Sequence, residues 1–110
     1  MIHTMHCQEP WFSLIKSGQK TVEGRKASPK YKNIKPGDTI RFFCDQAEFD
    51  AQVSGVNHYR SLKDYLERET LERALPGVKT LQEGMDIYLQ WSTLEQINKN
   101  GFLGIQVTLV

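Results

Sequence analysis

The chain has 110 residues, of which 39% are hydrophobic and 25% charged, and its formal net charge is +1. This length suits one modest core, so we predict a single domain over residues 1–110. The near-neutral charge argues against a protein that coats long nucleic acids by charge alone, although it allows a small basic pocket. No apolar run approaches the roughly 20 residues of a membrane span, and the N-terminus lacks the pattern of a secretory signal. We therefore expect a cytoplasmic protein with no membrane partner.

The first half of the chain predicts several strands and one short helix. Pro10 suits the first turn of a helix and Gly18 its end, whereas Pro36 and Gly37 mark a tight turn before a strand. Gly55 is expected to form a bulge in the longest strand. Alternation of apolar and polar residues places strands at residues 2–7, 20–25, 39–44 and 47–60, and the helix covers residues 10–17.

The second half is mainly helical until a closing strand. Ser61 and Thr80 are expected N-caps, and Glu83 stands three residues after Thr80, as in a capping box. The predicted helical segments cover residues 62–70, 81–91 and 92–101, and the last strand covers residues 102–110. This order lacks the alternation of strand and helix that builds a parallel sheet. It indicates a small α+β domain with a curled or closed sheet and helices around its rim.

The two cysteines and three histidines indicate no metal site. Cys7 and Cys44 form no C-x-x-C pair, and we interpret them as buried thiols in a reducing compartment, with a single disulfide left open. His3 and His6 fall on opposite faces of the first expected strand, and His58 is far along the chain. The sequence therefore predicts no metal and no other cofactor.

The stretch SGQKTVEGRK, residues 17–26, concentrates charge directly after an apolar segment. Arg25 can grip a phosphate or a carbonyl edge, Lys20 can bind an anion or act as a base where burial lowers its pKa, and Glu23 can accept hydrogens or move a proton. If the segment is extended, Thr21 lies on the same side as Glu23. The alternative is a solvated turn whose charges pair at the surface for little energy.

Several aromatic residues are candidates for stacking on a base. Tyr59 and Arg60 form an aromatic–cation pair that can stack a base and contact a phosphate, but packing of the tyrosine against the helices is equally compatible. Trp11 can stand at the mouth of a pocket or pack in the core. Tyr88 and Trp91 lie on an amphipathic helix, where such residues are more typical of a core.

Four segments together resemble the ASCH domain family, whose fold is similar to that of PUA domains. They are QEPWFSLIKSGQKTVEGRK, IKPGDTIRF, LPGVKTLQEGMDIY and GFLGIQV, and they span nearly the whole chain. The resemblance implies a small β-barrel with surrounding helices. It also implies a cleft lined by the K-T-x-E-x-R segment and suited to RNA or a nucleotide-like ligand.

Some members of the family are enzymes that hydrolyse the amide of acetylated cytidine, and others have been described as ribonucleases. The resemblance places the lysine of the amidohydrolases at Lys20, but Glu23 stands where they have a threonine nucleophile. Thr21 is a possible substitute, and Glu83 is the nearest match to their catalytic glutamate. The catalytic candidates are therefore Lys20, Glu23 and Thr21, in a hydrolase acting on a nucleoside amide or an RNA phosphodiester.

The function we predict first is binding of RNA or a modified nucleotide. The expected ligand contacts are Arg25, with Trp11 or Tyr59 stacking the base and Lys26 or Arg60 contacting phosphate. Hydrolysis is the alternative function. A third hypothesis, that YLERETLERAL is a protein-interaction surface, has less support because charged helices are usually only solvated.

Overall fold

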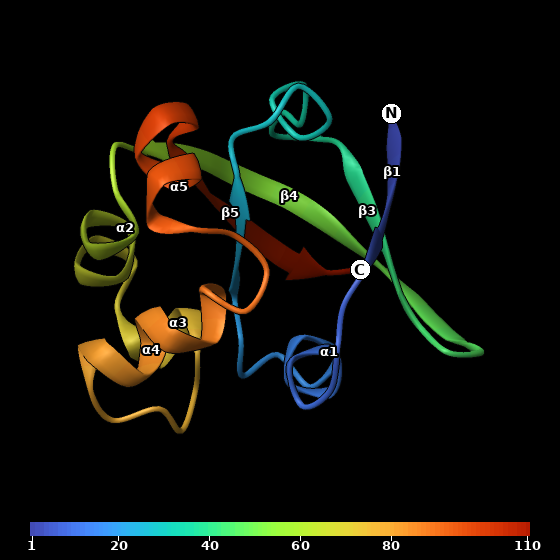
Figure 1. Ribbon diagram of the computed structural model, residues 1–110. Coiled ribbons are helices and arrows are strands. Elements are labelled where there is room, and N and C mark those ends of the chain that lie inside the picture. The colour runs from blue at the N-terminus through green and yellow to red at the C-terminus, as the bar shows by residue number, and fades with distance from the viewer.

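Five strands form one curled sheet in the computed structural model, which describes residues 1–110 (Figure 1). Their order is β1-β3-β4-β5-β2, so β1 and β2 are the two edges of the sheet. β1 runs parallel to β3, and every other neighbouring pair is antiparallel. The strands are β1 Ile2–His6, β2 Val22–Lys26, β3 Thr39–Cys44, β4 Ala47–Tyr59 and β5 Phe102–Leu109. The α+β class and the curled sheet expected from the sequence are confirmed.

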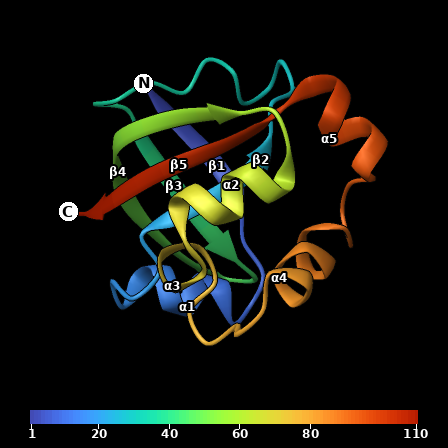
Figure 2. The same cartoon turned by 90° about the vertical axis from the view of Figure 1, so that its left-hand side faces the viewer.

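Four of the five helices lie between β4 and β5 in the chain and gather on one side of the sheet (Figures 1 and 2). Among them, α2 packs on β4 and β5, and α3 approaches β2. The short α1 follows β1 and contacts β3. The helices are α1 Trp11–Lys16, α2 Leu62–Glu69, α3 Leu71–Ala74, α4 Leu81–Tyr88 and α5 Leu94–Asn100.

The helices of this insert begin at hydroxyl side chains. The Ser61 side chain accepts from the backbone N–H of Asp64 at 3.1 Å, and the Thr80 side chain accepts from the backbone N–H of Glu83 at 3.1 Å. Each bond satisfies a backbone donor that the first turn of a helix leaves unpaired. Both expected caps are confirmed, and Glu83 is an exposed part of the second one.

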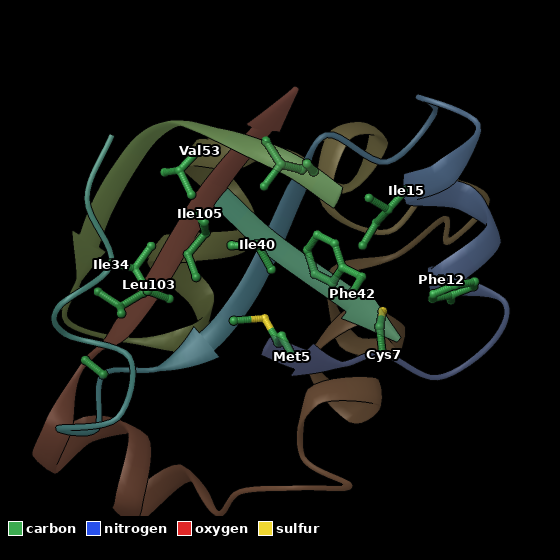
Figure 3. Packing of buried hydrophobic residues seen from close by; sticks show 13 residues of the cluster. Met5, Cys7, Phe12, Ile15, Ile34, Ile40, Phe42, Val53, Leu103 and Ile105 are labelled. Atoms are coloured by element: carbon green, nitrogen blue, oxygen red, sulfur yellow. The ribbon is translucent and has the colours of Figure 1, made fainter. Parts of the chain in front are cut away.

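Two hydrophobic clusters share the sheet. The first fills the concave side of the curl and contains 13 buried residues, among them Phe12, Ile40 and Ile105 (Figure 3). The second lies between the sheet and the helical insert and includes Val22 and Phe102. Because Val22 joins the second cluster, its neighbour Glu23 faces the other side of β2.

Two details of the strands also bear on the sequence predictions. The β4–β5 register shifts between Val53 and Gly55, which confirms the expected bulge. Both cysteines are free; Cys7 is buried as expected. The prediction of burial is wrong for Cys44, which is only partly buried because it ends β3 beside the turn into β4.

Candidate functional site

A cavity of about 300 Å³ lies where the two edge strands of the sheet approach each other. Residues from the end of β1, from β2 and from the end of α4 line it. We call the gap between β1 and β2 the seam. The Arg25 side chain crosses it, because its Nη2 donates to the carbonyl of His6 on β1 at 2.6 Å. Edge strands expose unpaired backbone groups, and this bond satisfies one of them while joining β2 to β1.

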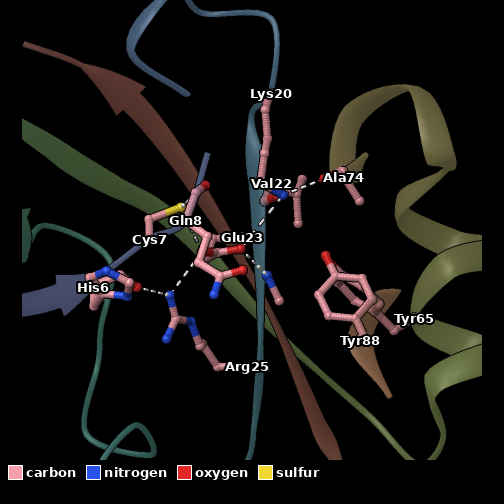
Figure 4. Close-up of polar contacts among 11 residues, drawn as sticks. His6, Cys7, Gln8, Lys20, Val22, Glu23, Arg25, Tyr65, Ala74 and Tyr88 are labelled. Carbon is pink, nitrogen blue, oxygen red and sulfur yellow. Dashed lines mark hydrogen bonds and ion pairs between the residues drawn. The ribbon is translucent and has the colours of Figure 1, made fainter. Parts of the chain in front are cut away.

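The floor of the cavity is a cluster of Lys20, Glu23 and Arg25 (Figure 4). Lys20 and Glu23 are only 1% and 6% exposed. The Glu23 carboxylate accepts from Arg25 Nη2 at 3.0 Å and from the backbone N–H of Gly24 at 3.0 Å, and it lies 3.5 Å from Lys20 Nζ. A carboxylate this deeply buried needs such partners, since an unpaired buried charge is strongly destabilising.

Lys20 is held by the backbone as well as by Glu23. Its Nζ donates to the carbonyl of Val22 at 2.6 Å and to the carbonyl of Ala74, the last residue of α3. The Glu23 carboxylate lies 3.5 Å from the same Nζ as an ion-pair partner, so the ammonium group is surrounded by three oxygen atoms. Lys20 therefore ties the helical insert to β2 and fixes the position of the carboxylate.

In this cluster, burial and the neighbouring charges of opposite sign shift each pKa in opposite directions. Burial alone would raise the pKa of Glu23, but the charges of Lys20 and Arg25 outweigh it and hold that pKa below its ordinary value. Burial lowers the pKa of Lys20, whereas the charge of Glu23 acts to raise it. Burial would also lower the pKa of Arg25, but Glu23 raises it above its ordinary value. The cluster therefore places two basic groups around one carboxylate.

The Cys7 thiol also borders Glu23. Its Sγ lies 3.6 Å from Glu23 Oε2, which it can reach as a weak donor. Burial raises the pKa of Cys7, and the negative charge of Glu23 raises it further. The thiol is thus protonated at neutral pH, unlike the thiolate of a reactive cysteine.

Aromatic rings form much of the cavity wall above the charged floor. The Trp11 ring centroid lies 5.9 Å from Lys20 Nζ, and the Tyr31 ring centroid lies 5.6 Å from the guanidinium carbon of Arg25, so both rings contribute cation–π contacts. Trp91 also lines the cavity, yet 51% of it is exposed. An exposed tryptophan at a cavity mouth offers a flat apolar surface to a ligand.

Five of the residues predicted as site residues line this one cavity: Trp11, Lys20, Glu23, Arg25 and Lys26. Thr21 does not. Its backbone is bonded to Arg73 and Val107, and it borders a separate depression. The alternation that was expected to bring Thr21 beside Glu23 does not extend to residue 21, because β2 begins only at Val22.

Three other candidates also lie outside the cavity lining. The Tyr59 hydroxyl donates to the buried carboxylate of Glu69 at 2.6 Å, and Arg60 is exposed just after β4. Glu83 belongs to the cap of α4. Conversely, Tyr88 and Trp91 line the cavity although their pattern was interpreted as typical of a core. Their second role appears only in the folded chain, where the end of α4 and the residues after it line the same cavity as β2.

Comparison with known proteins identifies the family. The ASCH domain model matches residues 5–109. The chain belongs to the ASCH domain family. Among solved structures, hypothetical protein PH0355 is 38% identical to this ASCH domain, with 100% of both chains covered and a TM-score of 0.93. Protein PF0455 from Pyrococcus furiosus is 36% identical over 97% of this chain and 96% of that chain, with a TM-score of 0.80.

A third structure, a mutant ZmASCH protein from Zymomonas mobilis, is 14% identical over 97% of this chain and 67% of that chain, with a TM-score of 0.70. At that identity the similarity shows the fold alone. The family and the PUA-like fold inferred from the sequence are thus confirmed. A search of curated proteins finds no match to this ASCH domain.

Two general features of this ASCH domain concern metals and membranes. No three His, Cys, Asp or Glu side chains come together in a way that would hold a metal ion. None of the helices combines the length and the apolar character needed to cross a membrane.

Proposed function

We propose that this ASCH domain binds RNA or a modified nucleotide in the cavity at the seam of β1 and β2. The observation that carries the proposal is the buried Lys20–Glu23–Arg25 cluster at the floor of an aromatic-walled cavity. Ligand pockets commonly measure about 300–1,000 Å³ and combine apolar walls with a few fixed polar groups. At about 300 Å³ the cavity suits one small ligand, such as a single base with its sugar.

Different side chains around the cavity would contact different parts of a bound nucleotide. Arg25 uses Nη2 for both Glu23 and His6, which leaves the hydrogens of Nε and Nη1 for a ligand. Trp11 and Trp91 provide faces on which a base can stack. Lys26, also in the lining, adds positive charge near the rim for a phosphate.

One observation favours hydrolysis of a nucleoside amide or an RNA phosphodiester as a second function. Lys20 and Glu23 are 3.5 Å apart at the floor of the cavity, which is the arrangement of an acid–base pair. Against it, Lys20 Nζ is bound to two backbone carbonyls and paired with Glu23, and Thr21 lies outside the cavity. Release of acetate from N4-acetylcytidine, or cleavage of RNA, that Lys20→Met abolishes would establish the enzyme.

The binding proposal is tested by the fluorescence anisotropy of a short labelled single-stranded RNA over a salt series. We expect wild-type affinity to fall as salt rises, because phosphate contacts release counterions. Arg25→Ala should weaken binding by about tenfold or more at every salt concentration, since it removes a charge-assisted contact in the cavity.

Arg60→Ala is the matched control, because it removes the same charge from an exposed position outside the cavity lining. It should leave most of the affinity in place. Circular dichroism must show that Arg25→Ala keeps its fold, since this arginine also joins β1 to β2. Equal affinity of wild type and Arg25→Ala would overturn the proposal.

A further inference from the structure

Two tyrosine hydroxyls meet beside the floor of the cavity. The hydroxyl oxygens of Tyr65 on α2 and Tyr88 on α4 are 2.8 Å apart. Tyr65 is completely buried, whereas Tyr88 is 6% exposed and lines the cavity. Figure 4 shows the two rings close together next to β2. The contacts assigned above to the bound nucleotide use neither hydroxyl.

The position of Tyr65 is fixed by its surroundings. Its ring packs against Phe102 at a centroid distance of 4.8 Å and against Tyr59 at 5.9 Å. A Cβ atom at Gly24 would lie 2.6 Å from the Tyr65 hydroxyl oxygen, so only glycine allows this hydroxyl to approach β2 so closely. Gly24 directly follows Glu23, which places the hydroxyl pair beside the charged floor.

The burial of Tyr65 decides the direction of the hydrogen bond between the two hydroxyls. Burial raises the pKa of both tyrosines, so both keep their hydrogen at neutral pH. A single bond uses one of these two hydrogens. The Tyr65 hydroxyl has Tyr88 as its only hydrogen-bond partner, so if Tyr88 donated, the Tyr65 hydrogen would be buried without an acceptor. Tyr65 therefore donates, and the hydrogen of Tyr88 is left for the cavity.

We propose that Tyr88 is a specificity-determining residue that donates its hydroxyl hydrogen to a carbonyl oxygen of the bound base. Tyr65 is the positioning residue that directs this donor. The inference rests on the nucleotide-binding function proposed above and extends it to a class of base. Uracil carries a carbonyl oxygen on both sides of its pairing edge. Adenine has the ring nitrogen N1 as its acceptor on that edge and an amino group where uracil has O4, so a hydroxyl donor directed at the O4 position would meet a second donor. The cavity should therefore prefer uracil to adenine.

The experiment compares anisotropy titrations of a labelled oligouridylate and a labelled oligoadenylate of equal length. Wild type should bind the oligouridylate more tightly. Tyr88→Phe keeps the ring and removes the donor, so its affinity for the oligouridylate should fall by about tenfold, the usual scale of one lost hydrogen bond to a buried partner. Its affinity for the oligoadenylate should not change. Tyr59→Phe, which removes a hydroxyl outside the cavity lining, should keep the wild-type preference.

A double variant, Tyr65→Phe with Tyr88→Phe, provides for the case in which Tyr88→Phe alone folds poorly. It removes both hydroxyls together, so that neither remains buried without a partner, and such paired replacements are often nearly neutral for stability. The double variant should also lose the preference for uracil.

The outcomes separate this inference from the proposed function. If wild type binds the oligouridylate and both variants keep the preference, Tyr88 is not the donor and the inference is overturned alone. If the variants lose the same affinity for both RNAs, the hydroxyls are only structural and the inference is again overturned. If wild type binds neither RNA, the RNA-binding part of the proposed function fails and the inference, which rests on it, fails with it.

Discussion

Replacing Glu23 by glutamine should destabilise the fold strongly, although it changes a single atom type. The substitution leaves Lys20, which is 1% exposed, without its counter-charge in the interior. It also removes the charged partner that Arg25 holds at 3.0 Å. Removing one member of a buried ion pair commonly costs about 3–5 kcal/mol.

The geometry places the expected loss toward the lower end of that range, at about 3 kcal/mol. Lys20 keeps its bonds to the carbonyls of Val22 and Ala74, which continue to stabilise the ammonium. The Arg25 side chain is 22% exposed, so water compensates part of its loss. A domain of this kind is stable by about 5–15 kcal/mol in total, so the change should be readily measured.

Urea denaturation of wild type and Glu23→Gln at neutral pH measures the effect. With a slope of about 1–3 kcal/mol per M, the midpoint should fall by roughly 1–3 M. Asp50→Asn is the control, because it makes the same chemical change in a half-exposed pair with Arg41 at 2.8 Å and should alter little. Unchanged midpoints for Glu23→Gln would refute the assignment of Glu23 as the buried charge that balances Lys20.

The same pair of proteins tests the ionisation of Glu23. Its folded pKa is lowered by Lys20 and Arg25 despite the opposing effect of burial, so the folded state binds this proton less readily than the unfolded state. Its stabilisation is therefore complete above the ordinary value of 4.5 and is lost as pH falls through the lower folded pKa. The difference between wild type and Glu23→Gln should shrink over that acidic range. A constant difference would contradict the lowered pKa.

Three further substitutions test the packing and the hydrogen bonds. Gly24→Ala puts a methyl group 2.6 Å from buried ring atoms and should lower the free energy of unfolding by about 1–3 kcal/mol in urea denaturation, whereas at Gly55 the methyl meets a flexible side-chain end and should cost less. Burial raises the folded pKa of Tyr65 well above the ordinary value of 10.0. The stabilisation that this tyrosine contributes is therefore complete below pH 10.0 and is lost as pH rises from there through the folded pKa. Tyr65→Phe should reduce this alkaline loss of stability in thermal melts. Tyr59→Phe breaks a 2.6 Å bond to the buried Glu69 and should cost about 1–3 kcal/mol, with RNA affinity retained in anisotropy.

The secondary structure could be predicted well because its signals are local. Hydroxyl residues at Ser61 and Thr80, alternation along residues 39–44 and the glycine at Gly55 each act within a few neighbours. What local patterns do not contain is the pairing of β1 with β3 in parallel, which leaves β1 and β2 as the edges. That pairing depends on contacts between distant segments, and it creates the seam in which the cavity lies.

In the candidate site, too, some features can be predicted from local sequence and others depend on contacts between distant segments. Lys20, Glu23 and Arg25 lie within six residues, so their type and spacing already indicate a site. The hydroxyl of Tyr88 cannot be assigned in this way, because an amphipathic helix shows which face is buried but not which neighbour a hydroxyl meets. Tyr59 shows the opposite error, in which a sequence pattern suggests a ligand contact that the structure does not support. Its neighbour Arg60 suggested such a contact, but the Tyr59 hydroxyl is bound to Glu69.

The buried charges of the site are expected to contribute little to the stability of the fold and more to the binding of a ligand. An ion pair in the interior is often no better for stability than apolar side chains of similar volume. Here every buried polar side-chain atom has a hydrogen-bond partner, so the cluster is fixed in place before a ligand arrives. A variant with both Lys20→Met and Glu23→Gln would remove the two charges together and should regain part of the stability that Glu23→Gln loses. If that variant folds but no longer binds RNA, the charges are retained for the ligand, because the fold itself does not need them.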